Sequence, residues 1–345
     1  MDVIELTKEL VAIPSVTNDE GEVCRLVIDR LEAAGWLVTT QEIAPEDGAT
    51  PALPRLNVLA RVADRTPDVV LTTHLDTVPP FIPPTEDDAR IYGRGTCDAK
   101  GIFAAQWIAA ERLRAEGHEG IALMGVVGEE TDSIGAKLIA PLLPAAKWII
   151  DGEPTQMKFA SGAKGILALA VTAKGKAGHS AYPEVGHNAL HDLVPALARL
   201  ISAELPFEER YGQTTVNIGV MNGGVAPNVL APAASARVMI RLGTTVEKVL
   251  PEVRSLLGDA LEVEITSTSE PHPMPVPDGQ DADVVKFGSD VPYLMKLGKT
   301  MLVGPGSIHD AHTSHEKIEK QELLDAVELY ADVARMLLTA EGGAA

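Results

Sequence analysis

Four short apolar runs, each leading into a histidine or a carboxylic acid, constrain this sequence more than any other feature. VVLTT leads into His74, GIALMGVV into Gly128 and the pair Glu129 and Glu130, KWIID into Glu153, and KTMLV into a loop that reaches His312. Continuous β-branched runs bounded by Gly or Pro are typical of buried strands in a largely parallel sheet. Helical patterns lie between them, as from Ile102 to Leu113. This alternation predicts an α/β fold.

The residues that follow these runs are expected at one place in the fold. In open α/β sheets, ligands bind beyond the carboxyl ends of the strands. Five imidazole and carboxylate groups gathered there would be electrostatically unfavourable without a counter-charge, whereas a pair of divalent cations would make the arrangement favourable. The sequence therefore predicts a site for two metal ions.

The composition excludes several other classes of protein. A formal net charge of −20 argues against nucleic acid or an anionic membrane as partner, because both require a basic face. No apolar run approaches the roughly 20 residues that span a bilayer, and the start, MDVIELTKEL, lacks the features of a secretory signal. The two cysteines, Cys24 and Cys97, form no CxxC pair, which excludes a cysteine-based zinc site. We expect a cytoplasmic globular protein.

The middle of the chain has a different pattern. Four segments are typical of strands: GILALAVTAKG, TTVNIGVMNGG, ASARVMIRL and LEVEITSTS. Two segments are typical of helices, one from Asn188 to Ile201 and the other TVEKVLPEVRSLLGDA. The resulting order, β-α-β-β-α-β, is that of a ferredoxin-like layer. We therefore predict a first domain formed by residues 1–162 and 271–345, with residues 163–270 inserted as a second domain.

Three motifs carry candidate chemistry, and two of them have a plainer explanation when taken alone. In HLDTVPP, His74 and Asp76 point to the same face of a strand end, so Asp76 can accept a hydrogen bond from the distal ring nitrogen of His74. The plainer explanation is a histidine that only ends a strand, which is common. In GRGTCDAKG the glycines allow a tight turn that brings Asp98 inward, and the spacing matches no phosphate-binding motif. Glu129 and Glu130 could simply begin a helix, where acids are frequent.

Taken together, the motifs make the chain resemble the zinc-dependent M20-type amidohydrolases and exopeptidases. They are HLDTVPP, GRGTCDAKG, GEETDSIGAK, DGEPT, GKAGHSAYP and GPGSIHDAHTSHE, and they occur in the family's order over nearly the whole chain. The family includes acetylornithine deacetylase, succinyl-diaminopimelate desuccinylase, aminoacylase and glutamate carboxypeptidase. The resemblance implies a zinc-exopeptidase-like catalytic domain, a ferredoxin-like lid and dimerisation domain, and a homodimer.

The resemblance also implies two zinc ions per subunit, for which Co²⁺ or Mn²⁺ could substitute. One ion would be held by His74, Asp98 and Glu153, and the other by Asp98, Glu130 and His312. The residues alone do not decide between His312 and its neighbours His309 and His315; the family pattern selects His312. Glu129 would act as general base on a water molecule whose pKa the ions lower, and Asp76 would orient His74.

Further residues match family positions that contact the substrate. His179 would reach the active site of a partner subunit and stabilise the oxyanion, and Asn228 and Arg241 would bind polar groups, since an arginine can hold a carboxylate with two hydrogen bonds. Without the resemblance, His179 is a turn histidine and Arg241 a surface strand residue. The loop with Gly304, Gly306 and Ser307 would approach the substrate through backbone amides.

The expected reaction is hydrolysis of the amide bond of an N-acyl amino acid or dipeptide. The GEET and GPGSI-x-x-AH patterns are most similar to acetylornithine deacetylase, which implies a role in amino-acid biosynthesis. A desuccinylase, a lysine-releasing relative and a dipeptidase or carboxypeptidase are the alternatives, because specificity depends on a few loop residues. A non-catalytic metal-binding dimer is a more remote one.

Overall fold

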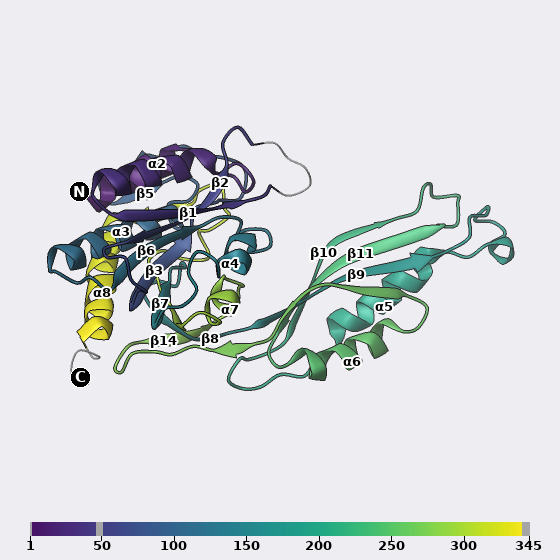
Figure 1. The fold of residues 1–345 in the computed structure, drawn as a ribbon. Coiled ribbons are helices and arrows are strands. Elements are labelled where there is room, and N and C mark those ends of the chain that lie inside the picture. Colours follow the sequence, from purple (N-terminus) through teal and green to yellow (C-terminus); the bar gives the residue numbers. More distant parts are fainter. Residues whose placement is uncertain (1, 46–50, 340–345) are drawn as a thin grey trace. The chain divides into compact units, whose positions relative to one another are not determined.

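The chain forms two compact units in a computed structural model that describes residues 2–45 and 51–339 (Figure 1). Unit 1 comprises Met1–Ser161, Met274–Asp283 and Ser289–Ala345, and unit 2 comprises Gly162–Pro273 and Val284–Gly288. The limits 1–162, 163–270 and 271–345 stay a prediction; unit 2 differs from the predicted insertion chiefly by including Val284–Gly288.

A six-stranded mixed sheet, with the strand order β1-β2-β6-β3-β7-β15, forms the centre of unit 1. The four predicted apolar runs form its parallel strands: β6 (Ile121–Val126), β3 (Val69–His74), β7 (Trp148–Asp151) and β15 (Lys299–Leu302). The strands β1 (Leu37–Ile43) and β2 (Arg55–Arg61) extend the sheet by antiparallel pairing. Every residue of β3 and β6 is buried, as expected for strands covered on both faces. The predicted α/β fold is confirmed.

Helices cover both faces of this sheet. Alternate side chains of β3 contribute to two separate apolar clusters, with Val69 and Leu71 in one and Val70 in the other. The larger cluster includes residues of α1 (Val3–Ala12), α2 (Gly21–Ala33), α3 (Lys100–Ala115) and α8 (Lys320–Thr339). Near the smaller cluster lie the short α4 (Ile134–Leu138) and α7 (Val291–Leu294). None of the helices described has both the length and the apolar character needed to cross a bilayer.

Two small three-stranded sheets also occur among the described residues. One consists of β4 (Thr85–Glu86), β5 (Arg90–Tyr92) and β16 (Lys317–Glu319), and the other of β8 (Phe159–Ala163), β13 (His272–Pro273) and β14 (Ala282–Val285). In the first, β16 pairs with β5, which brings a segment near the C-terminal end of the chain beside the segment that precedes Asp98. This pairing matters for the candidate site.

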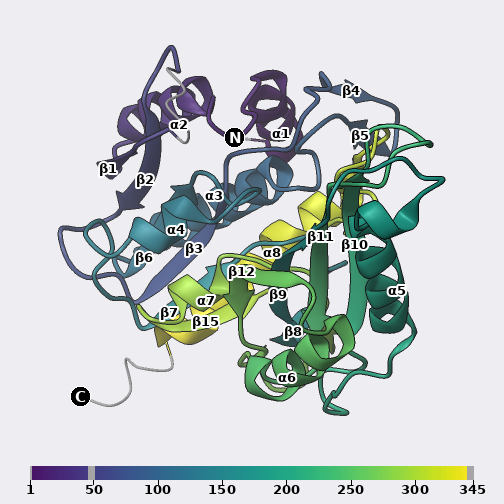
Figure 2. The same ribbon diagram turned by 90° about the vertical axis from the view of Figure 1, so that its right-hand side faces the viewer.

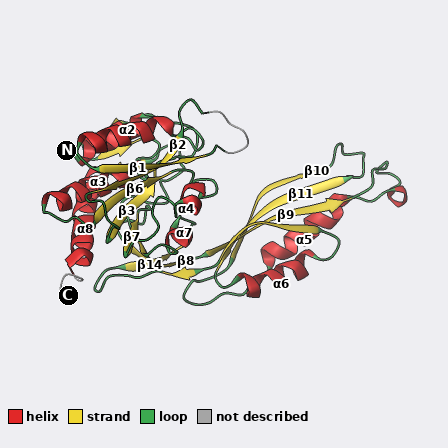
Figure 3. Cartoon of the chain, in the orientation of Figure 1, coloured by secondary structure: helices red, strands yellow, loops and turns green. Residues whose placement is uncertain are grey.

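Unit 2 is a four-stranded antiparallel sheet with helices on one face (Figures 2 and 3). Its elements follow the predicted β-α-β-β-α-β order: β9 (Gly165–Lys174), α5 (Ala189–Ser202), β10 (Thr215–Gly223), β11 (Ala233–Leu242), α6 (Val246–Leu257) and β12 (Glu262–Ser269), with a single 3₁₀ turn at Pro183–Val185. Alternate residues of β9 and β11 are buried in one cluster with residues of α5 and α6. The other face of the sheet carries the partly buried alternate residues, including Arg241.

Candidate metal centre

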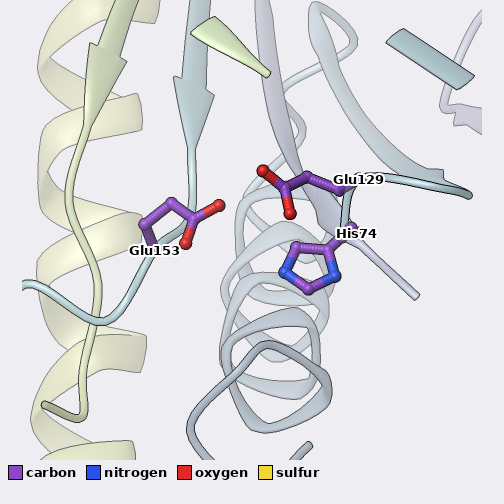
Figure 4. A group of neighbouring side chains, drawn as sticks. All are labelled: His74, Glu129 and Glu153. Carbon is purple, nitrogen blue, oxygen red and sulfur yellow. The ribbon is translucent and has the colours of Figure 1, made fainter. Parts of the chain in front are cut away.

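Three neighbouring parallel strands deliver the first predicted ligands to one edge of the sheet. His74 is the last residue of β3, Glu129 and Glu130 follow β6, and Glu153 follows β7; the strand order β6-β3-β7 makes these ends adjacent. One ligand atom from each of His74, Glu129 and Glu153 lies within 4.8 Å of the other two. Figure 4 shows the carboxylates of Glu129 and Glu153 pointing toward each other beside the His74 ring.

His74 also belongs to a second group, with Asp98 and Glu130, at the same spacing. Its Nε2 lies 3.0 Å from Asp98 Oδ1. His312 Nε2 lies 3.2 Å from Asp98 Oδ2 and 2.9 Å from Glu130 Oε2. Asp98 therefore contacts both histidines, one with each carboxylate oxygen, which is the placement expected of a bridging ligand. The structure brings all five predicted ligands together, and their division between two ions stays a prediction.

The charges in this cluster are those of a site for cations. Burial raises the pKa of Glu129 and of Glu153 well above the usual range for a carboxyl. Hydrogen bonds to Asp98 and Glu130 raise the pKa of His312 to about 10, so a protonated imidazole neutralises part of the negative charge. Imidazole nitrogens and carboxylate oxygens are suitable donors for Zn²⁺, Co²⁺ or Mn²⁺. The donor set present fits the implied metal pair.

Asp76 organises the turn that carries the two adjacent glutamates. Its Oδ1 accepts the backbone N–H of Glu129 at 3.1 Å, and its Oδ2 accepts that of Glu130 at 3.2 Å and the Thr17 hydroxyl at 2.8 Å. The closest partner of His74 Nδ1 is the main-chain carbonyl of Asp76 at 3.0 Å, whereas the carboxylate lies at 3.5 Å. The carbonyl is the nearer acceptor, the predicted contact with the carboxylate is also present, and both contacts leave Nε2 facing the other ligands.

The adjacent glutamates do not begin a helix. The helix α4 starts at Ile134, and the turn before it contains Gly128 with a φ of +76°. A side chain at Gly128 would also come within 2.7 Å of Ile134, so glycine is required for both conformation and space. The helix-start alternative is therefore wrong, and the two carboxylates enter different groups: Glu129 beside Glu153 and Glu130 beside Asp98.

The loop from Gly304 to Ser307 is closed by hydrogen bonds within the fold. The Gly304 amide donates to Thr155 Oγ1 at 3.0 Å, and the Gly306 amide donates to the carboxyl group of Glu322. Both donors are already paired, so a substrate would have to displace an existing partner. The predicted backbone contacts of Gly304 and Gly306 with a substrate stay a prediction. For Ser307, which forms a β-bridge with Thr155, substrate binding stays a prediction.

Within unit 2, the segments that carry His179 and Asn228 lie side by side. His179 forms a β-bridge with Val229, and the Ser180 amide donates to the Asn228 carbonyl at 2.9 Å. The Ala181 amide donates to His179 Nδ1 at 3.2 Å, so the ring proton of the neutral imidazole belongs on Nε2. His179 and Asn228 are exposed. Their exposure suits contact with a ligand, and the roles assigned to them stay predictions.

Arg241 is a half-buried cation on β11 of unit 2. Burial lowers the pKa of its guanidinium group. None of the ion pairs formed by the described residues involves Arg241. A partly desolvated guanidinium without an acidic partner favours binding of an anionic group.

Sequence reasoning missed three buried charged residues that support the site. Arg55 Nε and Nη2 donate to the two carboxylate oxygens of Glu20 at 2.7 and 2.9 Å, and neither side chain is exposed. A side chain at Gly128 would lie 2.9 Å from Arg55 Nη2, so this ion pair is adjacent to the glutamate turn. The third residue, Glu316, contacts the Asp98 loop. A charged residue has the same sequence pattern whether it is solvated or buried, so nothing identified them.

Comparison with known proteins agrees with this arrangement. Residues 70–336 match the model of peptidase family M20/M25/M40. A probable carboxypeptidase of Aspergillus terreus is 37% identical over 364 residues, which cover 94% of this chain and 83% of that protein. A tripeptidase from Staphylococcus aureus has a TM-score of 0.80 at 20% identity and covers 98% of both chains. A dinuclear metal-binding M20 peptidase of Bacillus subtilis has a TM-score of 0.68 at 14% identity and covers 98% of this chain and 97% of its own.

The family match covers most of the chain, including His74, Asp98, both adjacent glutamates and His312. The resemblance inferred from the motifs is therefore confirmed by an independent comparison, and the fold agrees with that of solved members. The chain belongs to peptidase family M20/M25/M40 and is a metallohydrolase that acts on peptides.

Proposed function

We propose that the protein is an exopeptidase of the carboxypeptidase type, which removes the C-terminal residue of short peptides. The observation that carries the proposal is the position of Glu129, whose carboxylate lies with His74 and Glu153 in one group of ligand atoms within 4.8 Å. A base at this position can act on a water molecule at the metal site. The similarity to a probable carboxypeptidase at 37% identity supports a peptide as substrate.

The residues of the cluster have two roles: five would be metal ligands, and Glu129 would transfer protons. His74, Asp98, Glu130, Glu153 and His312 would hold two divalent cations. When bound, such ions polarise the scissile carbonyl group and lower the pKa of the attacking water. Glu129 takes the proton of that water on a carboxylate oxygen and delivers it to the nitrogen of the leaving amine.

The carboxylate of the substrate is assigned to Arg241. A guanidinium group holds a carboxylate with two parallel hydrogen bonds, and each charged hydrogen bond contributes about 1.5–3 kcal/mol. The lack of an ion pair to Arg241 within the described chain supports this assignment. Asn228 would contribute a further polar contact. Recognition of a free carboxylate is what makes the enzyme release a terminal residue rather than cut within a chain.

A homodimer formed through unit 2 is part of the proposal. The strand β10 lies at the edge of its sheet, and its exposed residues include Val220 and Met221. An exposed apolar edge strand is suited to pairing with a second copy. His179 of one copy would then donate from Nε2 to the oxyanion that develops in the other. The proton position imposed by the Ala181 amide supports such a donor role.

An N-acyl amino acid deacetylase is the second candidate, favoured by the GEET and GPGSI-x-x-AH motifs. Its substrate would also present a free carboxylate on the leaving amino acid, so the same Arg241 contact would serve. The net charge of −20 weakly favours a basic leaving residue such as ornithine or lysine. We also propose a cytoplasmic location, which is supported by the two free, buried cysteines.

A matched substrate panel tests the proposal. For several amino acids X, including Lys, Leu and Glu, the panel contains Ala-Ala-X, Ala-Ala-X-amide and N-acetyl-X, and release of primary amine is followed with zinc and with chelator. We expect chelator-sensitive cleavage of Ala-Ala-X and at least about tenfold slower cleavage of the amide, from loss of one charged hydrogen bond. Faster turnover of N-acetyl-X would establish the deacetylase instead. No chelator-sensitive cleavage at all would indicate a non-catalytic metal-binding protein.

Arg241 variants test carboxylate recognition separately. Arg241→Met removes both hydrogen bonds and should raise KM for Ala-Ala-X by at least about 100-fold, and it should raise KM for the amide by a smaller factor. Arg237→Met is the matched control, since Arg237 lies on the same strand and the same face, four residues away. If Arg241→Met had the same KM as wild type for Ala-Ala-X and for its amide, the assignment of the substrate carboxylate to Arg241 would be wrong.

A further inference from the structure

Glu316 is a buried carboxylate with four partners in the loop that carries Asp98. It is 1% exposed and lies immediately before β16. Its Oε1 accepts the backbone N–H groups of Gly95 at 2.8 Å, Asp98 at 3.2 Å and Cys97 at 3.3 Å. Its Oε2 lies 2.5 Å from Arg94 Nη1. These contacts join two segments that are 218 to 222 residues apart in the sequence.

The loop from Gly93 to Asp98 depends on this anion for its shape. Three backbone N–H groups that converge on one oxygen form a concave anion-binding site. Without Glu316 these donors would be left inside the protein, where each unpaired group costs about 1–3 kcal/mol. The glycines alone allow many conformations, so the carboxylate selects the observed one.

The hydrogen bond to the Asp98 amide has a direct consequence for the metal centre. The side chain of the same residue places one oxygen 3.0 Å from His74 and the other 3.2 Å from His312. A displacement of the Asp98 backbone would therefore move the carboxylate that lies between the two groups of ligands. Glu316 also follows His312 by four residues, so its contacts connect the segment after one predicted ligand to the loop of another.

We propose that Glu316 is a positioning residue that aims the Asp98 carboxylate between two metal ions. The inference rests on the proposed function, because it takes Asp98 as the bridging ligand. Glu316 itself touches neither metal nor substrate. Through the position of Asp98, Glu316 would affect the affinity for the second ion and whether the Asp98 carboxylate can contact both ions.

A plainer role is that Glu316 only neutralises Arg94, which is itself 2% exposed. Two double variants separate the roles. Arg94→Met/Glu316→Leu removes both charges and the acceptor, whereas Arg94→Met/Glu316→Gln removes both charges but keeps an oxygen for the three amides. Charge balance predicts that the two double variants behave alike. Positioning predicts that only the glutamine variant keeps the metal pair.

The experiment is a Co²⁺ titration of the metal-free full-length protein, with bound metal measured per chain and the magnetic coupling of the ions followed by electron paramagnetic resonance. Wild type and Arg94→Met/Glu316→Gln should bind two coupled ions. Arg94→Met/Glu316→Leu should bind the second ion about 10- to 100-fold more weakly, the usual cost of losing an outer-shell partner, and lose the coupling. Thermal unfolding of each metal-free variant identifies any variant that fails to fold. If a double variant fails to fold, the single variant Glu316→Gln is compared with wild type in its place.

Glu319→Gln is the control from the same segment. Glu319 pairs with Arg90 at 2.6 Å, and both side chains are 43% exposed. Because this ion pair is on the surface, the Glu319→Gln variant should still bind two coupled ions. Coupling retained at wild-type affinity in the leucine variant, or lost equally in the Glu319 control, would overturn the proposal. Wild type that binds no coupled pair would instead contradict the proposed two-metal function, before any variant is compared.

Discussion

Glu129→Gln isolates the proton transfer from metal binding. Glutamine keeps the size of the side chain and one acceptor oxygen, but it cannot hold a proton from water. Burial raises the pKa of Glu129, and like-charge repulsion from Asp290 and Glu130 raises it further, so a neutral amide is well tolerated at this position in the metal-free protein. We therefore expect the variant to fold and to be no less stable than wild type.

The expected effect on catalysis follows from the role of the residue. A positioned general base contributes about 10²- to 10⁴-fold to the rate, which corresponds to about 3–5.5 kcal/mol in the barrier. Because Glu129 is assigned neither to a metal ion nor to the substrate carboxylate, the loss should fall on kcat with KM nearly unchanged. Zinc content should stay at that of wild type.

The neighbouring variant Glu130→Gln is the matched control. Glu130 contacts His312 at 2.9 Å and is a predicted ligand, so its variant should lose zinc together with activity. The assay measures kcat and KM on a free-carboxylate tripeptide beside zinc content by mass spectrometry. Near-normal turnover in Glu129→Gln would refute the general-base role, and loss of zinc in that variant would show that Glu129 is a ligand.

Three further predictions concern the support of the site and the core. Asp76→Ala should weaken metal binding by about 10- to 100-fold, because it removes the acceptor for the Glu129 and Glu130 amides; unchanged affinity in calorimetric titration would contradict this. Arg55→Met leaves Glu20 buried and unpaired, so the free energy of unfolding in urea should fall by about 3–5 kcal/mol, and a loss below about 1 kcal/mol would refute the argument. Burial raises the pKa of Cys24 from 9.0 to about 12. Between about pH 9 and pH 12 the thiol ionises in the unfolded chain but stays protonated in the folded protein, so the free energy of unfolding falls as pH rises. Cys24→Ala should make that fall smaller when unfolding is measured as a function of pH.

Much of the fold was predictable because its strands are continuous apolar runs. The runs before His74, Glu129 and Glu153 form β3, β6 and β7, which are neighbours in the sheet. Parallel strands that are buried on both faces require nearly continuous apolar sequences, which can be recognised in the chain. Their carboxyl ends meet at one edge of the sheet. The same reasoning could not predict β1 and β2, whose antiparallel pairing extends the sheet.

The ligands were predictable as a set, but their hydrogen-bond partners were not. His74 was expected to donate to the Asp76 carboxylate, whereas the main-chain carbonyl is closer at 3.0 Å. The loop of Gly304 was predicted to contact a substrate through backbone amides, but the hydrogen bond from the Gly304 amide to Thr155 was not predicted. Backbone carbonyls and amides are the same in every residue, so no side-chain pattern reveals which of them is paired. Glu316 was missed for a related reason, since its partners are mostly backbone N–H groups.

The most direct test of the account is a zinc titration of the metal-free protein, with peptide hydrolysis and bound zinc measured at each step. The account predicts that hydrolysis is absent without metal and reaches its maximum when two zinc ions are bound per chain, because Asp98 contacts the ligands of both predicted ions. Full activity at one bound ion, or activity that persists after removal of metal, would contradict the two-metal mechanism.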